Sequence, residues 1–130
     1  MAMTTAQAAP ATLAIGEVAA RTGLTVHTLR YYEGIGLLDR IQRDSGGRRL
    51  FTEEDLGWID LLTKLRRTGM PIAEMVEYAD LVRRGPSTHP ERIALLQSHR
   101  ARVQDQLEEL AGCLRVVDYK IDRYRGADVA

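Results

Sequence analysis

Residues 25–38 decide the fold, and they read T-V-H-T-L-R-Y-Y-E-G-I-G-L-L. The stretch opens on Thr25, whose hydroxyl can accept a hydrogen bond from an unpaired backbone N–H at the start of a helix. Val26 and Leu29 follow three residues apart, a spacing that places both on one helical face. Two glycines then stop the helix before an apolar pair. The stretch therefore predicts a short amphipathic helix.

The other face of this predicted helix carries His27, Thr28, Arg30 and Tyr31. A rigid element that presents an arginine, hydroxyls and an aromatic ring suits contacts with nucleic-acid phosphates and base edges. An ordinary capped surface helix would show the same residues. On this stretch alone both interpretations stay open.

A second helix is predicted just before it, over residues 15–22 (I-G-E-V-A-A-R-T). Ile15, Val18 and Ala19 have helical spacing, and Gly23 suits the left-handed position that ends a helix. Helix, tight turn and helix within about twenty residues form a helix-turn-helix.

A basic hairpin is predicted next. Residues 40–43 and 48–51 are short extended candidates, separated by D-S-G-G at positions 44–47, whose glycines tolerate a tight turn. The hairpin carries four arginines, which would repel one another unless something anionic lies across them. We interpret it as a wing that accompanies the helix-turn-helix, and a solvated, charge-rich loop is the alternative.

Two further helices complete the predicted head. Thr52 caps a helix that begins with three acids and ends at R-R-T-G, residues 66–69. Another helix begins at Met70-Pro71, because proline is tolerated in a first turn. It ends at Gly85-Pro86.

The C-terminal part predicts one long helix, from about Pro90 to Tyr124, which would extend roughly 50 Å. Its apolar positions recur at alternating steps of three and four, as in a coiled-coil seam. Such a seam most simply packs against a copy of itself, and packing onto the chain's own third and fourth helices is the alternative. The seam positions, all apolar except Arg100, are Ile93, Leu96, Arg100, Val103, Leu107, Leu110, Leu114, Val117, Ile121 and Tyr124.

Composition narrows the function classes. The chain has 130 residues and a formal net charge of zero, but residues 21–49 are locally rich in arginine and poor in acids. Its one cysteine, Cys113, cannot form an intramolecular disulfide, which fits a reducing compartment. No apolar run is long enough to span a bilayer. Residues 1–12 resemble a disordered tail more than a signal peptide.

An enzyme is not expected. We find no glycine-rich phosphate loop, no metal-ligand cluster and no nucleophile with a base beside it, so neither a cofactor nor a metal is predicted. Glu53, Glu54 and Asp55 could be proposed as an acidic site, but acids are favoured in the first turn of any helix.

The chain resembles the MerR family of bacterial transcription regulators. The matching stretches are I-G-E-V-A-A-R-T-G-L at 15–24, T-L-R-Y-Y-E-G-I-G-L-L at 28–38, G-R-R-L-F-T at 47–52 and L-R-R-T-G-M-P-I at 65–72. The last stretch looks most like the aldehyde- and electrophile-responsive branch, although the cysteine typical of that branch is replaced by Lys64. The resemblance implies a cytoplasmic, bacterial protein.

The resemblance also implies a mainly α fold: a winged helix-turn-helix head over 13–86, a dimerisation helix over 87–124 that forms an antiparallel coiled coil, and a tail over 125–130. Such a homodimer binds a palindromic promoter and distorts the spacer DNA between the two promoter elements that RNA polymerase recognises, so that the polymerase can engage both. Thr28, Arg30 and Tyr31 match recognition-helix positions, and the turn after Arg67 resembles a second wing. The candidate DNA-binding residues are Thr25, His27, Thr28, Arg30, Tyr31, Arg43, Arg48, Arg49 and Arg67.

The signal is not readable from the sequence. Cys113 is a possible sensor for oxidants or electrophiles, and a role as a small buried side chain beside Leu114 is the alternative. The operator, the inducer, the target genes and the resting state of the regulator are likewise open. A coiled-coil protein-interaction module without DNA binding is the competing function.

Overall fold

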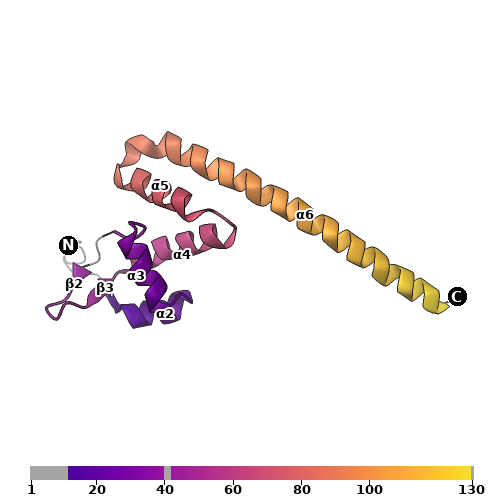
Figure 1. Cartoon of the computed structure of the whole chain (residues 1–130), viewed down its shortest axis with the longest axis horizontal. Coiled ribbons are helices and arrows are strands. Elements are labelled where there is room, and N and C mark those ends of the chain that lie inside the picture. Colours follow the sequence, from indigo (N-terminus) through magenta and orange to yellow (C-terminus); the bar gives the residue numbers. More distant parts are fainter. Residues whose placement is uncertain (1–11, 40–41, 130) are drawn as a thin grey trace, which may run out of the picture. The chain divides into compact units, whose positions relative to one another are not determined.

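The computed structural model describes residues 12–39 and 42–129, and the chain divides into two compact units, one up to Thr88 and one from His89 onward. The first unit holds the sheet, four α-helices and a short 3-10 helix among its described residues; the second is a single helix (Figure 1). The predicted tail over residues 1–12 lies outside the described residues except for Thr12.

The helix-turn-helix is confirmed. Helix α2 spans Ile15–Thr22 and helix α3 spans Val26–Gly34. Between them Gly23 adopts a φ of 78°, the left-handed conformation that costs glycine least. Val18 and Leu29 are buried, and the two helices pack against each other, as the apolar spacing of each helix predicted.

The sheet has one strand more than predicted. Strands β2 (Gln42–Arg43) and β3 (Arg49–Phe51) form the expected antiparallel hairpin, and β1 (Leu13–Ala14) pairs with the other edge of β3. Leu13 lies opposite Phe51, which is buried. A strand of two residues is too short to show the alternation that identifies strands from sequence.

Helices α4 (Glu53–Arg67) and α5 (Ile72–Arg83) close the head, followed by the short 3-10 helix η1 (Pro86–Thr88). The capping of α4 is as predicted, because Thr52 and Asp55 bond reciprocally to each other's backbone N–H. The core of the head consists of aliphatic side chains with few aromatics. It is formed by Val18, Leu29, Tyr32, Leu37, Leu38, Phe51, Leu56, Ile59, Leu62, Leu65, Met70, Met75, Tyr78, Ala79 and Leu81.

Helix α6 spans His89–Val129, 41 residues, which corresponds to about 60 Å at 1.5 Å per residue. It continues through most of the segment that the sequence assigned to a tail after Tyr124. A single glycine at position 126 weakens a helix by only about 1 kcal/mol, and no proline follows it. The helix therefore has no strong reason to stop where the apolar seam stops.

Candidate nucleic-acid interface

The start of α3 is fixed by its own hydroxyl groups. Thr25 accepts a hydrogen bond from the backbone N–H of Thr28 at 3.0 Å, and its hydroxyl donates to the hydroxyl of Thr28 at 2.9 Å. The Thr25 side chain is thus engaged as a helix cap. It was predicted as a DNA contact, and here its visible role is to hold the first turn of α3.

The outward face of α3 carries the remaining predicted residues. His27, Arg30 and Tyr31 are exposed and Thr28 is half-buried, whereas Leu29 is buried on the opposite side. Tyr31 leaves half of its surface exposed. A large aromatic side chain and a guanidinium are therefore presented on a rigid helix that is anchored by its other face.

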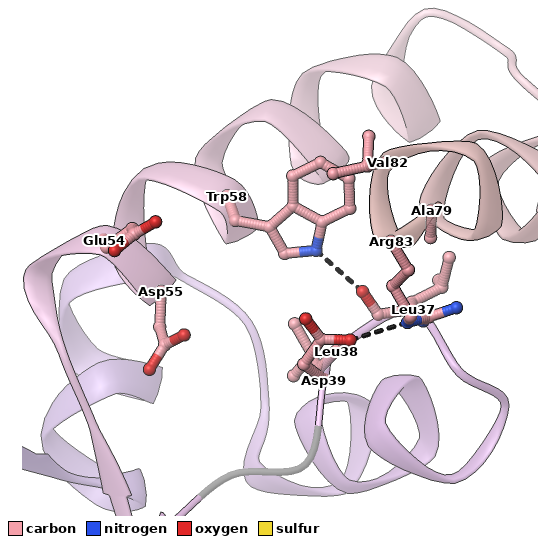
Figure 2. A pocket seen from close by; sticks show the side chains of 9 residues that line it. All are labelled: Leu37, Leu38, Asp39, Glu54, Asp55, Trp58, Ala79, Val82 and Arg83. Atoms are coloured by element: carbon pink, nitrogen blue, oxygen red, sulfur yellow. Dashed lines mark hydrogen bonds and ion pairs between the residues drawn. The ribbon is translucent and has the colours of Figure 1, made fainter. Parts of the chain in front are cut away.

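The chain after α3 is tied to α4 and α5. The indole Nε1 of Trp58 donates to the carbonyl oxygen of Leu37 at 2.7 Å, and Arg83 Nε donates to Asp39 Oδ1 at 2.6 Å (Figure 2). Arg83 also donates to the carbonyl oxygen of Gly36. Leu37, Asp39, Trp58 and Arg83 line a pocket of about 160 Å³. No pattern in the sequence indicates these bonds, because they join residues far apart in the chain.

The turn of the wing is organised by Asp44. Its Oδ1 accepts from the backbone N–H of Gly46 at 2.8 Å and of Arg48 at 2.9 Å, and the Arg48 guanidinium lies 3.3 Å from the same carboxylate. The hydrogen bond from the Arg48 backbone is the main reason why the pKa of Asp44 is lowered from its usual value. Gly47 closes the turn with a φ of 82°. Arg48 itself is largely exposed at the tip.

The other two described wing arginines share one carboxylate on α3. Arg49 Nε donates to Glu33 Oε1 at 2.5 Å, and Arg43 Nη2 lies 3.9 Å from the same oxygen. Arg43 also donates to the carbonyl oxygen of Gly47 at 3.0 Å. Glu33 was not predicted as a functional residue. Its signal was its place in the last turn of a helix, where the dipole disfavours an acid unless a cation compensates it.

These ion pairs correct one expectation about the wing. Its arginines were expected to repel one another without an external anion, but Arg43, Arg48 and Arg49 each have an acidic partner within the head. Two carboxylates therefore offset part of the repulsion among these three arginines within the head itself. Arg48, whose side chain is 83% exposed, is the best placed of the three for an intermolecular contact, and Arg49, at 20%, is the least.

Two predicted residues belong to elements other than α3 and the wing. Arg67 is exposed and ends α4, next to a turn closed by Gly69, whose φ is 99°. Cys113 is on α6 and is exposed in the single chain. Burial of Cys113 as a small side chain beside Leu114 would need a second copy across the seam, and this alternative stays a prediction.

Two other features, a metal-binding cluster and a membrane-spanning helix, were sought in the described part of the chain. Over residues 12–39 and 42–129, no group of three or more histidine, cysteine or acidic side chains could hold a metal ion. Within the same ranges no helix is both long and apolar enough to cross a bilayer.

Comparison with known proteins identifies the architecture. Residues 13–81 match the family model described as MerR HTH family regulatory protein, and residues 56–115 match the model described as MerR, DNA binding. The first match covers the helix-turn-helix, the wing and nearly all of α5. The second begins in α4 and extends into α6.

Individual relatives agree with this match. An HTH-type transcriptional regulator of Haemophilus influenzae is 34% identical over 89% of the chain and 86% of its own length. The regulator AdhR of Bacillus subtilis is 38% identical over 68% of the chain and 64% of AdhR. The crystal structure of HiNmlR, a MerR family regulator lacking the sensor domain and bound to promoter DNA, superposes with a TM-score of 0.81 and 33% identity, over 92% of this chain and 95% of that one.

Proposed function

Because the chain belongs to the MerR family of DNA-binding transcription regulators, we propose that it binds a palindromic promoter as a homodimer and distorts the spacer DNA in response to a signal. The observation that carries this proposal is the exposed face of α3, with Arg30 and Tyr31, beside a wing whose tip presents Arg48. The MerR family relative HiNmlR, similar over nearly the whole chain, is bound to promoter DNA in its crystal structure.

In the proposed complex α3 lies in the major groove, where arginine and hydroxyl groups can read base edges. Arg30, Thr28 and Tyr31 make the base and phosphate contacts, while Arg48 on the wing and Arg67 at the end of α4 contact the flanking phosphates. His27 supplies a further contact from the start of α3. Thr25 acts through its cap.

The proposed homodimer follows from the exposed seam of α6. Most of the predicted seam is uncovered in the single chain: Leu107, Leu110 and Leu114 are 56%, 62% and 62% exposed. Leu96 and Val103 are half-buried. An exposed apolar stripe of this length marks a surface that binds another protein chain. The proposed dimerisation residues are Ile93, Leu96, Val103, Leu107, Leu110, Leu114, Val117 and Ile121.

An antiparallel arrangement suits the spacing of this seam. Its steps of three and four read the same in both directions from a midpoint between Leu107 and Leu110. A second copy that runs the opposite way therefore places a seam residue opposite each seam residue, as a parallel copy in register also would. The antiparallel arrangement is proposed from the family resemblance. Two heads at the two ends of such a dimer would face the two half-sites of a palindrome.

The regulatory step is proposed from the family resemblance. The bound dimer stores contact energy in deformed spacer DNA, and RNA polymerase uses the promoter in that altered shape. The protein then acts on the chromosome in the bacterial cytoplasm. Cys113, which is exposed in the single chain, is the proposed entry point for an oxidant or electrophile.

The first experiment is a DNA-binding titration of the full chain. The probe is the DNA upstream of the protein's own gene, at several salt concentrations, with a scrambled duplex of equal length as the control. We expect tight, salt-steep binding to one palindrome. Binding no tighter than to the scrambled duplex at every salt concentration would contradict the proposal.

The sensor is tested in the same assay. Thiol oxidant should shift the affinity of the wild-type chain and leave that of a Cys113→Ser variant unchanged. If neither a thiol oxidant nor a thiol-reactive electrophile affects the wild-type chain, Cys113 is not the sensor and a small molecule that binds without reacting must be sought.

The competing function, a protein-interaction module without DNA binding, has one observation in its favour. The three described wing arginines each lie beside a carboxylate of the head, so part of their charge is offset without a polyanion. Replacing Arg30 and Arg48 by alanine separates the two functions. A DNA-binding regulator loses affinity and salt sensitivity, whereas an interaction module keeps its partner binding.

A further inference from the structure

We infer that Glu33 is a positioning residue for DNA binding: it joins the wing to the recognition helix and keeps Arg43 and Arg49 from binding phosphates indiscriminately. This role rests on the proposed function. This role explains why an acid lies in the last turn of α3. It also means that Arg49 does not contact DNA directly.

Burial distinguishes this ion pair from the others in the head. The side chains of Glu33 and Arg49 are 17% and 20% exposed, whereas the pair of Arg48 with Asp44 is 83% and 30% exposed. A pair with little access to water is screened less by salt and holds its geometry more firmly. Glu33 and Arg49 are also sixteen residues apart, so their bond links two separate elements.

The register of the hairpin explains why a carboxylate is needed there. Arg43 and Arg49 are directly opposite each other on β2 and β3. Like charges in a cross-strand pair destabilise a sheet. The carboxylate of Glu33 lies at 2.5 Å from Arg49 and 3.9 Å from Arg43, so a single acid on α3 offsets the repulsion between them.

The same ion pairs fix the wing relative to α3. Glu33 is on the helix that carries Arg30 and Tyr31, and Arg49 is one residue from the exposed Arg48 at the wing tip. A contact between helix and hairpin therefore sets how far apart the groove-reading and phosphate-binding groups stand. That spacing is what a specific complex requires, because phosphate contacts set the register in which bases are read.

Loss of the carboxylate should thus change the affinity for non-specific DNA and the affinity for the specific duplex by different amounts. Freed guanidiniums can reach phosphates, which carry no sequence information, so non-specific binding strengthens. The specific complex does not strengthen equally, because the wing is no longer held in register. Specificity therefore falls while the pairing of cations with phosphates increases.

The test compares Glu33→Gln with Glu17→Gln in the full chain. Glu17 is exposed in the first turn of α2 and has no ion pair within the described residues, so the control removes the same charge without breaking a contact. The specific probe is a duplex that the wild-type chain selects from a random pool. The non-specific probe is a random-sequence duplex of equal length, and both are titrated at several salt concentrations.

We expect Glu33→Gln to lower the ratio of specific to non-specific affinity by about tenfold, equivalent to about 1.4 kcal/mol. The slope of log affinity against log salt should steepen by about 0.9 for each additional phosphate that the freed arginines neutralise. The double variant Glu33→Gln with Arg49→Gln restores the net charge. It should lose the part of the steepening that comes from Arg49, because only Arg43 is then freed from Glu33, and keep the lowered ratio.

Three results would overturn the inference. Glu33→Gln could match Glu17→Gln in ratio and slope, or it could weaken both duplexes equally with a lower thermal midpoint, as a purely structural residue would. The double variant could lose about 0.9 of the wild-type slope, which would make Arg49 a direct phosphate contact. If the wild-type chain fails to select any duplex, the proposed function has failed, and that outcome is distinct from these three.

Discussion

Leu114→Ala is expected to weaken the proposed homodimer strongly. Leu114 lies on the seam of α6 and is 62% exposed in the single chain. Burial of a whole leucine side chain contributes about 1.5–3 kcal/mol, so covering the exposed part contributes about 1–2 kcal/mol. Because the substitution occurs in both copies, the expected loss is about 2–4 kcal/mol. The dimer dissociation constant should therefore rise by about 30- to 1,000-fold.

Val116→Ala is the matched control for this prediction. Val116 is 64% exposed, nearly the same as Leu114, but two residues along a helix rotate a side chain by about 200° and place it on the opposite face. Alanine is a better helix former than either residue, so neither variant weakens α6 itself. The control should change the dissociation constant by less than about threefold, as expected for a surface substitution within about 0.5 kcal/mol.

The assay is sedimentation equilibrium of the full chain over a range of concentrations. Equal dissociation constants for the two variants, or an unchanged constant for Leu114→Ala, would refute the seam as the dimer interface. A monomeric wild-type chain at every concentration would refute the dimer itself. A far-ultraviolet circular dichroism spectrum of each variant checks that α6 has kept its helix.

Three further predictions concern the head. Arg30→Ala should lower affinity for the selected duplex by about 1–3 kcal/mol and flatten its salt dependence, as measured by fluorescence anisotropy. Trp58→Phe removes the donor to the buried Leu37 carbonyl oxygen and should lower the free energy of unfolding in urea by about 1–3 kcal/mol. The pKa of Asp44 is lowered in the folded state, chiefly by the hydrogen bond from the Arg48 backbone. The Asp44 carboxylate therefore stabilises the wing at neutral pH, and this stabilisation is lost as the pH falls through the lowered pKa. The NMR shifts of the two turn amides should accordingly change at a lower pH than those of an aspartate in an unfolded peptide, and a transition at the ordinary aspartate pKa would contradict this.

Local interactions made much of the fold predictable from the sequence. The ends of α2, α3 and α4 follow from caps and glycines that act within a few residues, and the structure places Gly23, Thr25 and Thr52 in those roles. The apolar spacing likewise indicated the buried side of α3. The family motifs lie in the same local stretches, so the family was also readable there.

The features that the sequence did not predict involve partners distant in the chain or patterns too short to read. Strand β1 has two residues, which is too few for a periodic signal, and it forms only because β3 offers a free edge. Helix α6 continues past its apolar seam because nothing in the backbone stops it.

The sequence by itself determined the helix-turn-helix, the basic hairpin and the long seam, since caps, turn residues and periodicity act over a few neighbouring positions. Only the tertiary structure decided which charged side chains form ion pairs within the protein. Glu33 and Arg49 are sixteen positions apart, and their contact places a predicted DNA-binding residue in an internal bond. The sequence does not show whether the guanidinium of an arginine faces a carboxylate or water, because only folding brings the carboxylate within reach.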